Sequence, residues 1–122
     1  MTLNDAQGST YTCNKAYLID DTAMDLLCDA QILTTHLTLT GQDVGYLCSL
    51  SISGGRNVAL KQRAVQSSDY NNIYIADKAV DGNRNTDIGQ NSCTRTNDPD
   101  AQPNWNVKFS NIKLVNRYVL FN

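Results

Sequence analysis

A polar segment, Asp81–Ser92, carries the residue types and spacing most suited to binding a cation. Four of its residues alternate with others and end in oxygen: Asp81, Asn83, Asn85 and Asp87. Side-chain oxygens and exposed carbonyls are the ligands that calcium prefers. The spacing departs from the calcium loop of helix–loop–helix proteins at two positions. Thr86 stands where glycine makes the turn, and Ser92 stands where glutamate closes the shell. A turn-rich surface loop is the alternative interpretation.

Catalytic chemistry finds little support in the sequence. A serine or cysteine nucleophile needs a base, and His36 is the sole histidine, placed in a segment with strand character. Carboxylates cluster before it, but no spacing singles out a pair among Asp20, Asp21, Asp25 and Asp29. We therefore predict that the chain is not an enzyme.

Three arginines, Arg84, Arg95 and Arg117, are candidates for ligand recognition. A guanidinium group presents several donors in a fixed plane, which suits sugar hydroxyls or carboxylates. Surface arginines without such a role are the commoner alternative.

The four cysteines indicate covalent cross-linking. Cys13, Cys28, Cys48 and Cys93 are separated by 15, 20 and 45 positions and form no C-x-x-C pair. Zinc sites use closer spacings, so a structural zinc is disfavoured. An even number of widely spaced cysteines favours two disulfides in an oxidising compartment. Scattered buried thiols in a cytosolic protein are the alternative.

Strand patterns surround these residues. Leucine alternates with threonine over Thr34–Thr40, and Tyr46–Ser53 places Cys48, Leu50 and Ile52 on one face. Strand character returns over Trp105–Phe109 and Leu114–Phe121. Short strands joined by long loops predict an all-β sandwich.

The remaining segments are predicted to be less regular. Residues 1–12 are polar and expected to be loose, and Ala16–Leu27 reads as a loop or a weak helix. Ala76–Val80 is long enough for one helical turn. Residues 81–102 contain only three hydrophobic side chains, those of Ile88, Cys93 and Ala101. A loop of this length inside a compact domain is typically functional or disordered.

Length and composition exclude several classes of function. A chain of 122 residues suits one domain. A net charge of -2 and an aromatic content of 7% do not predict binding to nucleic acid. No apolar run reaches the length of a membrane helix. The first residues have neither a basic start nor an apolar core, so no signal peptide is predicted.

Five short motifs stand in one order in the second half of the chain: Asn57-Val-Ala-Leu60, Gln66-Ser-Ser68, Ala79-Val-Asp-Gly-Asn-Arg84, Ser92-Cys-Thr94 and Pro103-Asn-Trp-Asn-Val107. Through them this half, about Arg56–Asn122, resembles the opening half of the fucolectin, or F-type lectin, domain. Their agreement in type, order and spacing makes the resemblance specific.

The first half is similar to the closing part of the same family. Cys13 and Cys28 are spaced like its late cysteines, and Tyr46-Leu-Cys-Ser49 is similar to its closing strand. Residues 1–53 then look like the tail of one repeat and residues 56–122 like the head of the next, joined at 54–55. The resemblance implies a jelly-roll β-sandwich of the galactose-binding-domain type, partial or circularly permuted.

The resemblance also implies a calcium site and a damaged sugar site. The positions that match the family's calcium ligands are Lys78, Asp81, Asn83, Ser92, Cys48 and Ser49. Ser49 replaces a glutamate, so a weak site is expected. Fucose binding in the family uses one histidine and two arginines. Arg95 stands at the histidine position, and both arginine positions lie beyond Asn122.

These likenesses imply disulfides Cys13–Cys28 and Cys48–Cys93 and a secreted parent protein. We expect a calcium-dependent module for fucosylated glycans or glycoproteins, of the kind used in innate immunity, with an incomplete sugar site. Homo-oligomerisation is left open, and membrane insertion is not expected. The alternative is a discoidin-like adhesion or protein-interaction domain without sugar binding.

Overall fold

The computed structural model describes residues 2–4, 10–12, 15–53 and 56–122. Its strands are β1 (Thr2–Asn4), β2 (Thr10–Thr12), β3 (Lys15–Asp20), β4 (Ala23–Thr40), β5 (Ser49–Ser53), β6 (Arg63–Gln66) and β7 (Asn104–Phe121). Three short 3-10 helices complete it: η1 (Gln42–Gly45), η2 (Ala76–Val80) and η3 (Ile88–Gln90). No α-helix occurs in these ranges, and the expected all-β class is confirmed.

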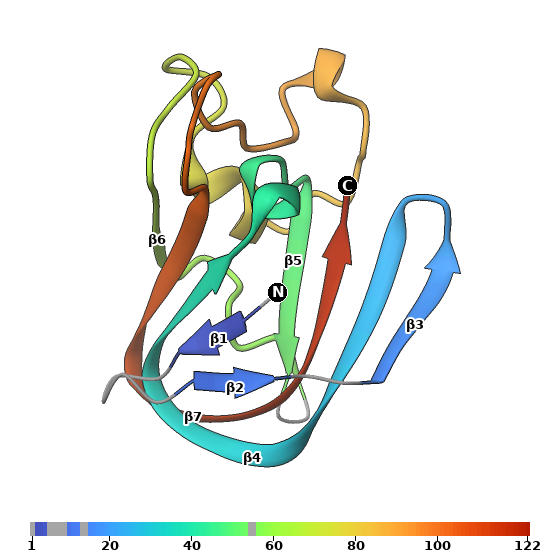
Figure 1. Ribbon diagram of the computed structural model, residues 1–122, viewed down its shortest axis with the longest axis vertical. Helices are drawn as coiled ribbons and strands as arrows, with labels where there is room; N and C mark the ends of the chain where they lie inside the picture. Colours follow the sequence, from blue (N-terminus) through green and yellow to red (C-terminus); the bar gives the residue numbers. More distant parts are fainter. Residues whose placement is uncertain (1, 5–9, 13–14, 54–55) are drawn as a thin grey trace.

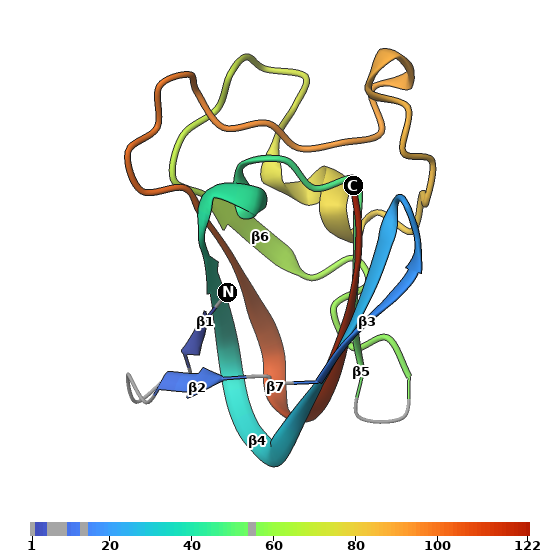
Figure 2. The same ribbon diagram turned by 45° about the vertical axis from the view of Figure 1, so that its right-hand side comes forward.

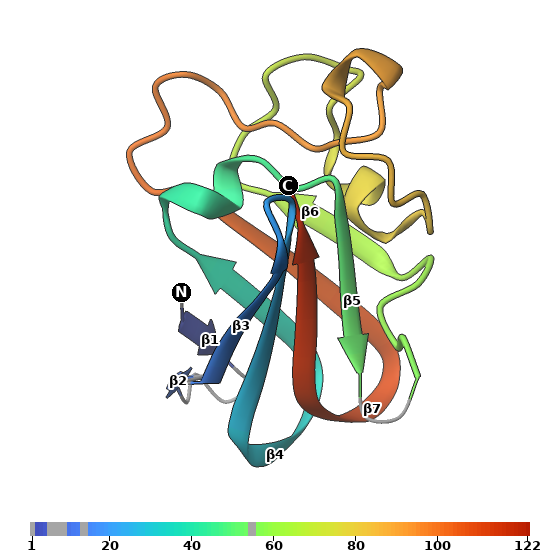
Figure 3. The ribbon, with the colours of Figure 1, turned by 90° about the vertical axis from the view of Figure 1, so that its right-hand side faces the viewer.

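The strands form one antiparallel sheet built on β4 and β7 (Figure 1). The sheet order is β2-β1-β4-β7-β5, with β3 paired to β4 and β6 paired to β7. β4 and β7 have 18 residues each. Their register shifts between Leu27 and Ile32 and again between Thr34 and His36. Both strands bend sharply in this region, so the sheet folds over on itself (Figures 2 and 3).

The core lies inside the folded sheet and follows the alternation of the strands. Leu50 and Ile52 of β5 are buried, as are Trp105 and Val107 of β7. η2 packs against β5 and β6, and its Ala76 carbonyl accepts the Trp105 Nε1–H bond at 3.0 Å. A buried indole needs such a partner, so this bond ties η2 to the core.

The two segments on either side of residues 54–55 share this sheet and this core. β7, from the second segment, pairs with β4 and β5 of the first. Gly54 and Gly55, the expected junction, lie outside the described residues. The segments therefore do not fold as separate bodies.

Two expectations for the N-terminal part of the chain were wrong. Ala16–Leu27 is neither loop nor helix, because β3 and the start of β4 form a hairpin there. Its turn is closed by the Asp20 Oδ1 atom, which accepts hydrogen bonds from the Thr22 N–H and hydroxyl. Residues 2–4 and 10–12, expected to be loose, pair as β1 and β2.

Several connecting segments gather at the end of the molecule opposite the bend of β4 and β7 (Figures 1 and 2). They comprise residues 67–75, 81–92 and 94–103, together with η1. The expected helical turn at Ala76–Val80 and the long polar loop after it are confirmed. Across the described ranges, no helix is long and apolar enough to cross a membrane.

Candidate functional site at the loop end

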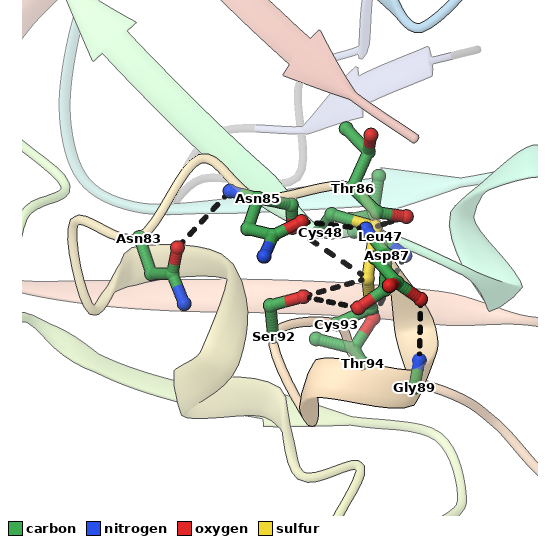
Figure 4. The surroundings of a disulfide bond; sticks show 10 residues. All are labelled: Leu47, Cys48, Asn83, Asn85, Thr86, Asp87, Gly89, Ser92, Cys93 and Thr94. Atoms are coloured by element: carbon green, nitrogen blue, oxygen red, sulfur yellow. Dashed lines mark hydrogen bonds between the residues drawn. A yellow bond between two sulfur atoms is a disulfide. The ribbon is translucent and has the colours of Figure 1, made fainter.

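The polar segment after η2 follows a repeated backbone turn. The Oδ1 atoms of Asp81, Asn83, Asn85 and Asp87 each accept the backbone N–H two residues further on. The four bonds measure 2.7, 3.0, 2.9 and 2.9 Å. Figure 4 shows the last of them ending at Gly89. Asp and Asn favour such turns. We call this series of four turns the Asx ladder. It fixes the backbone conformation of a segment that has no apolar core of its own.

The disulfide Cys48–Cys93 anchors the far end of this ladder (Figure 4). The pairing implied by the family resemblance is therefore confirmed. Cys13 lies outside the described residues, so the expected Cys13–Cys28 pairing is not described. Leu47 and Thr94 flank the bridge and are joined by two hydrogen bonds, Thr94 N–H to Leu47 O at 2.6 Å and Leu47 N–H to Thr94 Oγ1 at 2.9 Å.

The loop also packs directly on the disulfide. The Cys48 sulfur lies 3.7 Å from the Thr86 carbonyl oxygen, and the Cys93 sulfur lies 4.0 Å from that of Asn85. A disulfide sulfur carries no proton, so these are packing contacts. The buried Ser92 hydroxyl donates to the Asp87 carbonyl at 2.8 Å.

The residues predicted to hold calcium are only partly brought together. Cys48, Ser49 and Ser92 are buried around the disulfide. Asp81 and Asn83 are exposed at the start of the Asx ladder, where their side-chain oxygens already accept backbone bonds. Lys78 belongs to η2.

Asp87, one of the four alternating residues of the sequence prediction, contacts Ser92. The contact is made by the backbone carbonyl oxygen of Asp87, whereas its Oδ1 atom accepts the Gly89 N–H. No three His, Cys, Asp or Glu side chains gather as a metal site in the described part of the chain. A calcium site here would therefore contain at most two carboxylates and take its remaining ligands from carbonyl, amide and hydroxyl oxygens, a composition that calcium accepts.

Arg95 occupies a second cluster, built on aromatic rings. Its guanidinium carbon lies 3.9 Å from the centroid of the Tyr70 ring. Its backbone N–H donates to Tyr74 O, and its carbonyl accepts from the Tyr70 N–H and from Gln66 Nε2. The Tyr70 and Tyr74 rings lie 6.2 Å apart. These contacts hold Arg95 in one place.

A pocket of about 350 Å³ opens beside Arg95. Its lining includes Gln42 and Tyr46 together with Arg95, Asn97 and Asp98. Burial raises the pKa of Tyr46, although the charge of Arg95 acts in the opposite direction. The Tyr46 hydroxyl can donate a hydrogen bond to a ligand in the pocket.

The carboxylate of Asp100, which also lines this pocket, accepts several hydrogen bonds. Asp100 Oδ2 accepts hydrogen bonds from the hydroxyls of Ser67, at 2.5 Å, and Ser68, at 2.6 Å. Its Oδ1 accepts the Gln102 N–H at 3.1 Å. The two hydroxyls hold the pKa of Asp100 below its usual value. These bonds connect the loop after β6 to the loop before β7.

The other candidate residues have structural partners. Arg84 lies 5.4 Å from the Phe121 ring centroid, and Arg117 forms a bidentate ion pair with Asp25. His36 pairs in β4 with Lys108 of β7, as its strand character predicted. Arg95 is the one of the three candidate arginines that lines the pocket.

The sequence prediction missed the aromatic partners of Arg95. Tyr46 and Tyr70 are 24 residues apart in the chain and meet Arg95 only through the loop packing. No periodicity or motif marks them. Comparison of the chain with known protein families, curated proteins and solved structures finds no match.

Proposed function

We propose that this chain is a non-catalytic carbohydrate-binding module of the F-type lectin kind. The observation that carries the proposal is the pocket of about 350 Å³ beside the stacked guanidinium of Arg95. Pockets from about 300 Å³ upwards accommodate small ligands. Arg95, Tyr46 and Asn97 offer donors and Asp98 offers acceptors, a mixture that suits the hydroxyl groups of a sugar.

The proposed ligand is a fucose-type sugar bound weakly. The resemblance assigns one sugar-contact position to the described residues, at Arg95, and the pocket is lined by this one arginine. Charge-assisted donors contribute much of the discrimination between ligands. With a single arginine, we expect dissociation constants in the millimolar range, near about 4 kcal/mol of binding free energy.

The family fold is part of the same proposal. A jelly-roll sandwich related to galactose-binding domains, circularly permuted, would place the loops of both chain segments at one end. The folded-over sheet and the gathered loops support this arrangement. The disulfide supports a secreted parent protein, because such bridges persist in oxidising compartments.

Calcium is proposed as a structural ion of the Asx ladder. The carboxylates of Asp81 and Asp87, the Asn83 amide, the Ser92 hydroxyl and nearby carbonyls would supply oxygen ligands. A bound ion would neutralise the carboxylates and stiffen the loop. Isothermal titration to about 10 mM calcium tests this, within the range of weak extracellular sites. Asp87→Asn should weaken binding several-fold, whereas Asp21→Asn, in the β3–β4 turn, should not. If titration of the wild type with calcium produces no heat of binding, the metal site is rejected, whereas the sugar proposal is unaffected.

The sugar proposal is tested by titrating fucose to about 50 mM and following amide chemical shifts, with mannose as the comparison. Shifts should concentrate at Tyr46 and Arg95–Asp98. Arg95→Lys should reduce affinity at least five-fold because the planar, stacked donor is lost. Arg63→Lys, on β6, is the matched control. Unchanged spectra with both sugars would overturn the proposal.

A protein-contact domain is the second candidate, favoured by exposed apolar side chains on the loop after β6. Tyr70, Ile73 and Ile75 are 45%, 42% and 37% exposed. Such loop tips suit a discoidin-like adhesion domain. This function would be favoured over sugar binding by two results together. The protein would bind no glycan on an array, and it would bind a protein partner in a way that Ile73→Ser abolishes.

A further inference from the structure

β3 is an edge strand with unusual apolar exposure. All six of its residues are exposed, and Tyr17, Leu18 and Ile19 reach 56%, 76% and 56%. Among the described strands it pairs only with β4, and the hairpin lies at the margin of the molecule (Figure 1). An edge strand presents backbone N–H and C=O groups for pairing with another chain.

The two faces of β3 are set by its register on β4. Lys15, Tyr17 and Asp20 lie opposite Leu27, Asp25 and Ala23, which alternate along β4. The irregularity between Leu18 and Asp20 makes Ile19 the extra residue and brings Asp20 to the face of Lys15 and Tyr17. Ala16 and Leu18 lie on the other face. Charges therefore occupy only the two ends of one face, with Tyr17 between them.

We infer that β3 pairs antiparallel with β3 of a second copy of this chain, about a twofold axis at Tyr17. A twofold axis perpendicular to the sheet keeps each side chain on its own face. In this register the two Tyr17 side chains face each other, and Lys15 of each copy faces Asp20 of the other. Opposite charges and aromatic pairs across strands are both stabilising.

Charge complementarity selects both the partner and the register. The neighbouring symmetric registers, centred on Ala16 or Leu18, separate Lys15 from Asp20. On the other face, Ala16 lies opposite Leu18 of the second copy. Leu18 borders a pocket of about 380 Å³, which Met24, Leu26 and Leu120 also line. The added strand extends this apolar surface and covers part of Leu18, whereas a polar partner would not.

The interface is small, so weak association is expected. Sedimentation velocity from about 10 µM to about 1 mM should show the average mass rising from one chain towards two, the regime of such contacts. Tyr17→Lys should remain a single chain throughout. It faces Asp25 within its own hairpin, so the hairpin is retained, but two lysines meet at the axis.

Charge reversal provides a matched pair of variants. Lys15→Glu places like charges opposite each other at both ends and should weaken association at least five-fold. Lys108→Glu changes the net charge equally at an exposed position on β7 and should leave association within about two-fold, as expected for a distant site. Circular dichroism confirms that each variant is folded.

Cross-linking tests the register directly. Residues directly opposite in an antiparallel pair have Cα atoms about 4.5–5.5 Å apart, within disulfide range. Tyr17→Cys should form an interchain disulfide under mild oxidation, and Ala16→Cys should do so at least ten-fold more slowly. A single-chain mass for the wild type at every concentration, or equal association of Tyr17→Lys and wild type, would overturn the inference.

Discussion

The guanidinium of Arg95 stacks on the ring of Tyr70, 3.9 Å from its centroid. The stack fixes the plane of the donors at the edge of the pocket. Ordering a flexible arginine on binding costs conformational entropy, which a stacked side chain has already lost.

Removal of the stack should therefore weaken sugar binding without unfolding the chain. Tyr70→Ala should raise the dissociation constant for fucose about three- to ten-fold, equivalent to about 1 kcal/mol. Tyr70→Phe keeps the ring and should stay within about two-fold of wild type. The amide-shift titration measures both variants. Equal loss in the two would assign the effect to the hydroxyl instead.

The disulfide Cys48–Cys93 should make a large contribution to stability. It closes 45 residues of chain, and replacement by alanines should lower the free energy of unfolding by about 2–4 kcal/mol. Urea unfolding of the oxidised wild type and the double variant measures the difference. A loss below about 0.5 kcal/mol would show that the loop is held without the bridge.

The same material tests the Cys13–Cys28 prediction. Alkylation without reduction should leave the intact mass unchanged, because all four cysteines are expected to be paired. Incorporation of two labels would contradict that second pairing while leaving Cys48–Cys93 intact. Peptide mapping identifies the labelled positions.

Each hydrogen bond of the Asx ladder should stabilise its own part of the loop. Asn85→Ala removes the acceptor for the Asp87 N–H and should cost about 0.5–1.5 kcal/mol, the usual value of such a bond. Hydrogen exchange of the Asp87 and Gly89 amides should accelerate, whereas β7 amides should not. Asn72→Ala, in the loop after β6, is the control. An unchanged exchange rate at Asp87 would contradict the ladder.

Low pH should weaken the hydrogen bonds that the Asp100 carboxylate accepts from Ser67 and Ser68. Its pKa is lowered in the folded protein by the Ser67 and Ser68 hydroxyls, so its stabilising contribution is complete above the ordinary pKa of 3.8. That contribution is lost as the pH falls through the lowered folded value. Asp100→Asn should flatten the acid limb of the melting-temperature profile. A limb identical to that of wild type would show that other carboxylates control it.

Tyr118 should show the opposite pH dependence. It is buried in the core, and its hydroxyl has no hydrogen-bond partner among the described residues. Burial raises its pKa to about 12, so its contribution holds below the ordinary value of 10 and is lost as pH rises towards 12. Tyr118→Phe removes an unsatisfied polar group, and should stabilise the protein by about 1 kcal/mol and weaken the alkaline limb. Destabilisation would indicate an internal water on the hydroxyl.

The parts of the fold that the sequence predicted have a regular period. Thr34–Thr40 and the second half of Tyr46–Ser53 lie in strands because their apolar residues alternate. The β3–β4 hairpin was not predicted because β3 is exposed on both faces and its sequence shows no alternation of apolar and polar residues. β6 escaped too, as Ala64 is its only buried residue.

The candidate site was likewise predicted only in part from the sequence. The Asx residues and Cys48–Cys93 were predicted from local composition and from the family resemblance. The pocket was not, because Tyr46, Tyr70 and Arg95 come from three different loops. Such convergence depends on how the loops pack, which local sequence does not encode.

The central position of β7 also bears on synthesis of the chain. β5 and β6 pair with no described strand other than β7, and β4 has β7 along most of its length. While the ribosome is still making residues before Asn104, only the pairings among β1, β2, β3 and β4 are available. Half-made chains would expose Leu37, Leu50 and similar core side chains to chaperones. Closure of the sheet is thus expected to wait until β7 has left the ribosome, as is usual for topologies dominated by distant pairings.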